Sequence, residues 1–145
     1  MKTILSIIFM ICFQVGFSQE TKCKFEEKLI SGNISIDLPC KYRKNITSYE
    51  EGYFISFTFP DTLGITIFDG TMAGVPILQD NQGYIVTQTD TVNNKIKTIG
   101  IKDGNYWRED LILPKKSWIR VMYIDIPLNK KDFYDKILDS AIVNK

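Results

Sequence analysis

Apolar and polar residues alternate through much of the chain, which is the pattern of half-buried β-strands. In the segment 53–59 every odd-numbered position is aromatic or aliphatic, whereas the even-numbered positions include serine and threonine. Segment 34–38 also alternates, with its apolar residues at the even-numbered positions, and Pro39 ends it. Segment 65–68 is a further short apolar segment with one threonine. Because proline cannot donate a hydrogen bond to a neighbouring strand, we expect 34–38 to be a half-buried edge strand.

The second half of the chain predicts four strands joined by short turns, at residues 84–92, 95–102, 105–113 and 118–126. Asn93-Asn94 and Asp103-Gly104 separate the first three, and both pairs favour the positive φ angles of a tight hairpin turn. Residues 114–117 are predicted to form the last turn. Consecutive strands joined in this way predict an antiparallel meander.

The period of the pattern changes after Pro127. Asn129 is a candidate helix cap, and Asp132, three residues later, completes a weak capping box. Charged residues occupy one face of the predicted helix, and the other face must be buried, so we expect the helix to pack on its own sheet. The apolar residues at helical spacing are Tyr134, Ile137, Leu138, Ala141 and Ile142.

These elements predict an α+β fold that is mainly antiparallel β, with a meander sheet of about six or seven strands and a C-terminal amphipathic helix packed on it. The alternative is a small up-and-down barrel with an external helix. That order of elements is similar to the lipocalin family of carriers, although the lipocalin signature near the first strand is absent. Exported domains of the PsbP type also end in a helix after a meander, but they normally have another helix in mid-chain. Segment 70–83 is too short and too rich in glycine to form it, so we assign no family.

The amino terminus has the order of a cleavable secretory signal. Lys2 precedes an apolar run at 4–13, and the small residues Gly16 and Ser18 stand three places and one place before Gln19. A membrane-spanning helix needs about 20 apolar residues, twice the length of this run. We therefore interpret residues 1–18 as a signal peptide of bacterial type and 19–145 as one exported globular domain, periplasmic or secreted, without a membrane anchor.

Charge and length narrow the class of this domain. Loss of Lys2 with the leader leaves 17 basic and 17 acidic groups, so the mature chain is almost neutral. Such a balance provides no electrostatic footprint for nucleic acid or for an anionic membrane. The length fits a single domain with a substantial core.

Cysteine positions agree with export. Cys12 lies inside the leader after the bulky residues 9–11, which disfavours a lipid-modified cysteine. Cys23 and Cys40 remain after cleavage, and an even number in an oxidising compartment predicts one disulfide. Their separation does not match the C-x-x-C spacing of redox or metal pairs.

The chain contains no histidine. This removes the usual general base at neutral pH, the histidine-dependent triads, and the commonest zinc and copper ligand. Phosphate-binding glycine loops and nucleophile elbows are also absent from the sequence. We expect no cofactor and no catalytic metal.

Carboxylates remain as candidate catalytic groups, and a glycosidase needs two of them about 5 to 9.5 Å apart. The best candidates lie on one predicted strand, where Trp107 and Glu109 share one face and Arg108 and Asp110 share the other. Aromatic rings beside carboxylates would suit a hydrolase that acts on sugars. The interpretation we favour is a solvated strand with an Arg–Asp pair on one side and a core tryptophan on the other.

The favoured function is therefore a small non-catalytic binding protein, such as an inhibitor, an immunity protein or an accessory subunit, whose partner is another protein. The alternatives are a carrier of an apolar ligand in a barrel cavity and a carboxylate-dependent hydrolase. Irregular loops on rigid sheets commonly carry function, so we place the contact surface on the loop from residue 69 to 83. Calcium could bind near Asp80-Asn81, although no recognised calcium loop is present. The candidate contact residues are Asp69, Met72, Val75, Pro76, Asp80 and Asn81.

Overall fold

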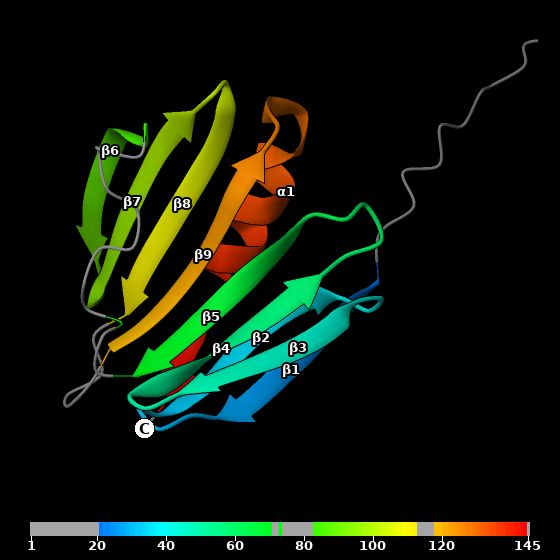
Figure 1. The fold of residues 1–145 in the computed structure, drawn as a ribbon, viewed down its shortest axis with the longest axis vertical. Coiled ribbons are helices and arrows are strands. Elements are labelled where there is room, and N and C mark those ends of the chain that lie inside the picture. The colour runs from blue at the N-terminus through cyan, green and yellow to red at the C-terminus, as the bar shows by residue number, and fades with distance from the viewer. Residues whose placement is uncertain (1–20, 71–72, 74–82, 113–117, 145) are drawn as a thin grey trace, which may run out of the picture.

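A computed structural model describes residues 21–70, 73, 83–112 and 118–144. The predicted leader lies outside these residues. The elements, labelled in Figure 1, are β1 (Lys22–Lys28), β2 (Asn33–Pro39), β3 (Arg43–Tyr49), β4 (Gly52–Thr58), β5 (Gly64–Gly70), β6 (Ile85–Val92), β7 (Lys95–Lys102), β8 (Asn105–Ile112), β9 (Trp118–Ile126), α1 (Leu128–Asp139) and β10 (Ile142–Asn144).

Seven strands form one antiparallel sheet in the order β3-β4-β5-β9-β8-β7-β6. The predicted meander from β6 to β9 is confirmed. Its tight turns are those expected from the sequence, because Asn93, Asn94, Asp103 and Gly104 all have positive φ angles between 50° and 82°. This sheet is open, with β3 and β6 at its edges, so the predicted alternative of a closed barrel is wrong.

A second sheet of three strands, in the order β1-β2-β10, lies behind the first (Figure 1). Cys23 in β1 and Cys40, which follows β2, form the predicted disulfide. The prediction that 34–38 is an edge strand is wrong, because β2 lies between β1 and β10. Pro39 is compatible with this central position because it is the last residue of β2, opposite Lys22.

The helix α1 packs on β8, β9 and β2, which confirms that it covers its own sheet. Its predicted start is wrong: Pro127 is the residue before the helix, no side chain caps it, and Asn129 lies inside the first turn. The fixed φ angle of proline is already suited to a helix start. Ile142 was expected on the buried stripe but belongs to β10.

The hydrophobic core lies between the two sheets and the helix. Phe25 of β1 meets Phe57 of β4 edge to face, with ring centroids 4.8 Å apart. Phe59 stacks against Tyr134 of the helix at 5.8 Å. The core therefore concentrates over β4, β5 and β9, while β6 and β7 extend beyond it.

Candidate functional site

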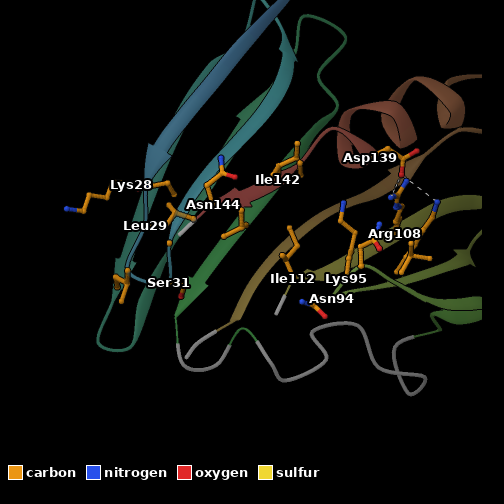
Figure 2. Close-up of a pocket in the computed structure, with 18 of the residues that line it drawn as sticks. Lys28, Leu29, Ser31, Asn94, Lys95, Arg108, Ile112, Asp139, Ile142 and Asn144 are labelled. Atoms are coloured by element: carbon orange, nitrogen blue, oxygen red, sulfur yellow. Dashed lines mark hydrogen bonds and ion pairs between the residues drawn. The ribbon is translucent and has the colours of Figure 1, made fainter. Parts of the chain in front are cut away.

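An open groove of about 1090 Å³ lies between the three-stranded sheet and the β6–β7 hairpin. One wall is the turn between β1 and β2 together with β10, and the other wall is the hairpin. Figure 2 shows Leu29 and Ile142 on the first side and Asn94 on the second, with Ile112, at the end of β8, between them. The groove exists because the helix ends at Asp139 and β10 is only three residues long, so this part of the large sheet is left partly uncovered.

Three large apolar side chains that line the groove are mostly exposed to solvent. Ile30 is 72% exposed, Val92 61% and Ile142 58%. Single exposed apolar residues are ordinary on protein surfaces, whereas contiguous apolar patches are a feature of interaction sites. These three come from a turn, an edge strand and the C-terminal strand, so only the tertiary structure brings them together.

The groove is bordered at the helix by a buried guanidinium group. Arg108 is 0% exposed, and its Nε and Nη2 atoms each donate to one oxygen of Asp110 at 2.7 Å. Its Nη1 donates to Asp135 Oδ1 at 3.0 Å, and Nη2 also donates to Asp139 Oδ1 at 2.5 Å. The cation is thus fully paired, and the pairing fixes the helix on β8.

Two lysines of β7 extend this ionic cluster towards the groove. Lys95 Nζ lies 3.3 Å from Asp110 Oδ2 and donates to the carbonyl oxygen of Leu138 at 3.1 Å. Lys97 Nζ lies 3.7 Å from Asp139 Oδ1. Lys95, Lys97 and Arg108 are therefore all paired with aspartates. Lys28 and Asp90 also line the groove and form no ion pair within the described part of the chain.

Asp135 connects the helix to β9. It accepts hydrogen bonds from the Tyr123 hydroxyl at 2.8 Å and from Lys131 Nζ at 2.5 Å. Burial works against ionisation of Asp135, but the hydrogen bonds from Lys131, Arg108 and Tyr123 outweigh it and lower the pKa of this carboxyl group. Burial, followed by the bond to Asp135, raises the pKa of the Tyr123 hydroxyl.

The two candidate catalytic carboxylates do not share a site. Asp110 faces the helix, whereas Glu109 projects from the opposite face of β8 and pairs with Arg120, whose guanidinium also donates to the carbonyl oxygen of Ala73 at 3.0 and 2.8 Å. The predicted sharing of faces is confirmed, and Trp107 is buried as expected. The predicted solvation is wrong, because α1 covers Arg108 and Asp110.

Asp69 was expected on the contact loop, but the structure places it in the interior, at the end of β5. Its Oδ2 atom accepts from the N–H of Ile30 at 2.6 Å, and its Oδ1 atom accepts from the hydroxyl of Ser31. Asp69 therefore fixes the turn that forms one wall of the groove. The other candidate contact residues lie outside the described residues: Met72, Val75, Pro76, Asp80 and Asn81.

Neither a metal centre nor a membrane span is found in the described part of the chain. No group of three or more potential ligands among histidine, cysteine, aspartate and glutamate is present there. Within the same residues, no helix has the length and apolar character needed to cross a bilayer.

The groove was missed at the sequence level for a simple reason. Its walls come from the turn at 29–32, the hairpin tip and β10, which lie far apart in the chain. The one local signal was Ile30, a large apolar residue shortly before the predicted strand at 34–38. One apolar residue at such a position does not identify a groove unless the other walls are known.

No known protein family, curated protein or solved structure matches this chain at a significant level.

Proposed function

We propose that this protein is a small exported, non-catalytic binding protein, of the kind represented by inhibitors, immunity proteins and accessory subunits. Its recognition surface is the groove between the three-stranded sheet and the β6–β7 hairpin. The observation that carries the proposal is the gathering of Ile30, Val92 and Ile142 around one concavity. Each square ångström of apolar surface that a partner covers there contributes roughly 25 cal/mol to association, before the costs of binding are subtracted.

The chemistry of the chain supports binding over catalysis. The sequence has no histidine, and Cys23 and Cys40 are joined in a disulfide. Asp110 and Glu109, the carboxylates considered for hydrolysis, are each held by an arginine and face opposite sides of the sheet. A pair of carboxylates acting on one bond would have to face the same substrate.

The carrier hypothesis has lost the feature on which it depended. An apolar ligand sequestered from water needs an enclosed cavity, and the large sheet is open rather than closed into a barrel. An open groove instead suits a partner that keeps one side in solvent.

Export is part of the proposal. A disulfide is typical of oxidising compartments, and the Cys23–Cys40 bridge is compatible with a periplasmic or secreted location. The leader predicted at 1–18 would deliver the chain there, and the mature amino terminus would then be Gln19.

The test is a capture experiment from the native cell envelope with the mature protein as bait. A groove variant combines Val92→Ser with Ile142→Ser. The matched control is Ile46→Ser on β3, because Ile46 is exposed to 52% but lies on the far edge of the sheet. We expect the wild type and the control to retain the same protein and the groove variant to lose it.

Two results would contradict the proposal. Equal capture by all three baits would remove the groove as the recognition surface. A failure of the wild type to retain any protein specifically would remove the binding function itself.

A further inference from the structure

Among the described strands, β10 has a neighbour on one side only. It pairs with β2 in an antiparallel register that sets Val143 opposite Ile34. Its other edge is the outer edge of the three-stranded sheet, and no described strand pairs with it. This edge borders the groove, since all three residues of β10 line it.

The direction of the backbone groups on β2 follows from two hydrogen bonds. In an antiparallel pair, alternate residues direct their N–H and C=O groups to opposite sides. The N–H of Asp37 donates to Ser140 Oγ at 2.9 Å, on the side of β10. The N–H of Cys40 donates to Thr21 at 3.2 Å, on the side of β1. Odd-numbered residues of β2 therefore direct their backbone groups towards β10.

The alternation along β2 shows which residue of β10 directs its backbone N–H and C=O groups away from β2. Ser35, an odd-numbered residue of β2, stands opposite Ile142, so these two exchange backbone hydrogen bonds. The next residue, Val143, must then direct its N–H and C=O groups away from β2. Its side chain packs against the core, so these free backbone groups are held in a fixed position.

The turn between β1 and β2 also holds β10 in place. A Cβ atom on Gly32 would lie 3.0 Å from Val143 Cγ1 and 3.1 Å from the carbonyl oxygen of Asn144. Gly32 also has a φ angle of 153°, which other residues rarely adopt. The turn can therefore approach β10 closely only because residue 32 is glycine.

The charged side chains at the helix end of the groove are paired with one another, which favours an uncharged occupant at that end. Lys95 and Lys97 are paired with Asp110 and Asp139, and Arg108 is fully paired. A charged side chain entering this end of the groove would lose water without gaining a free counter-charge. Apolar side chains would instead meet Ile112 and Ile142, which Figure 2 shows, and Val92, which also lines the groove.

We infer that the groove receives an extended, uncharged segment of a partner protein, which adds to the β1-β2-β10 sheet as a fourth strand along the free edge of β10. The inference rests on the proposed binding function and specifies its ligand. Backbone hydrogen bonds to Val143 supply the attachment, and the apolar lining of the groove selects the alternating side chains of the segment. Edge strands with free backbone groups are ready templates for such pairing.

The experiment uses a phage-displayed library of random twelve-residue peptides, panned against the immobilised mature protein. We expect enriched peptides that alternate apolar residues with polar, uncharged ones. The test variant is Val143→Pro, which removes the outward N–H and leaves the bonds between Ile142 and Ser35 unchanged. The matched control is Val143→Ala, which shortens the side chain but keeps the N–H group.

Binding of the enriched peptides should weaken at least about tenfold in Val143→Pro relative to Val143→Ala, since a backbone hydrogen bond is lost and the proline ring obstructs the edge. In the wild type, hydrogen exchange of the Val143 amide should slow when an enriched peptide is added. This second measurement does not depend on whether the proline variant folds.

Three outcomes would overturn the inference: no enrichment, enrichment of charged peptides, or unchanged Val143 exchange on binding. Its failure can be separated from that of the proposed function. If Val143→Pro folds and still captures the envelope partner that the Val92→Ser, Ile142→Ser variant loses, the groove binds its partner without strand addition.

Discussion

The two halves of the seven-stranded sheet are covered by different kinds of contact, apolar packing in one half and ion pairs in the other. Over β4, β5 and β9 the three-stranded sheet supplies aliphatic and aromatic side chains, and Ile36, Ile55 and Ile67 are fully buried there. Over β8 the helix instead meets the sheet through Arg108 and its aspartates. The apolar half is stabilised in proportion to buried area, whereas the ionic half depends on every partner being present.

This difference also explains where the groove lies. The hydrophobic core fills the space between the three-stranded sheet and β4, β5 and β9. The ionic contacts of the helix, in contrast, end with its last turn at Asp139. Beyond Asp139 the next described element is the short strand β10, and the sheet below it is left partly open. The proposed recognition surface thus lies where the large sheet is no longer covered by the helix.

The largest expected effect comes from removing the cation of the ionic half. Arg108→Met should lower the free energy of unfolding by about 4 kcal/mol, because it leaves Asp110 buried without the partner that holds both of its oxygens. Urea denaturation followed by circular dichroism measures this loss. The double variant Arg108→Met, Asp110→Leu should recover part of it, since position 110 then no longer buries a carboxylate that has lost its arginine and keeps only Lys95 as a counter-charge. A loss below about 1 kcal/mol in the single variant would show that the cluster does not hold the helix.

A somewhat smaller effect is expected in the apolar half. Ile36→Ala should lower the free energy of unfolding by about 3 kcal/mol, through lost burial and the cavity that remains. The matched control is Ile46→Ala, which changes the same side chain at an exposed position and should cost less than about 0.5 kcal/mol. In the ionic half, a second substitution at position 110 should recover part of the lost free energy of unfolding. We expect no such recovery when a second substitution is added next to Ile36→Ala. Equal costs for the two alanine variants would contradict the assignment of Ile36 to the core.

The smallest effect is the pH dependence of the ionic half. The pKa of Asp135 is lowered in the folded state, so its contribution to stability is present above the ordinary pKa of about 3.9 and is lost as the pH falls towards the folded value. Stability measured between pH 7 and pH 3 should therefore fall less steeply for Asp135→Asn than for the wild type. Superimposable slopes would show that Asp135 does not contribute to acid sensitivity.

At high pH the dependence of stability on pH has the opposite sign, so stability falls as the pH rises. The raised pKa of Tyr123 stabilises the folded protein while the hydroxyl is protonated in both states, and this contribution is lost as the pH rises above about 10. Tyr53 behaves in the same direction, because burial raises its pKa to about 12.

The local pattern predicted the meander well. Asn93-Asn94 and Asp103-Gly104 fixed two hairpins, because few other residue pairs adopt their backbone angles without strain. Three strands escaped prediction. β1 and β3 are rich in charged and polar residues, and β10 continues the helical spacing of α1 as far as Ile142.

The candidate site was predicted only in its parts. The Arg108–Asp110 pair was expected, since residues two apart share one face of a strand. That the pair would be buried, and would bind Asp135 and Asp139, depended on where the helix packs. Asp69 was assigned to a surface loop, but its carboxylate is directed inwards to the turn at Ile30 and Ser31.

The sequence by itself determined the meander, the final helix, the disulfide and the absence of histidine chemistry, because these follow from neighbouring residues, from cysteine number and from composition. Only the tertiary structure decided that β2 is central, that the large sheet stays open and that three exposed apolar residues meet at one groove. Those features arise from contacts between segments far apart in the chain, and such contacts leave no periodic trace in any one of them.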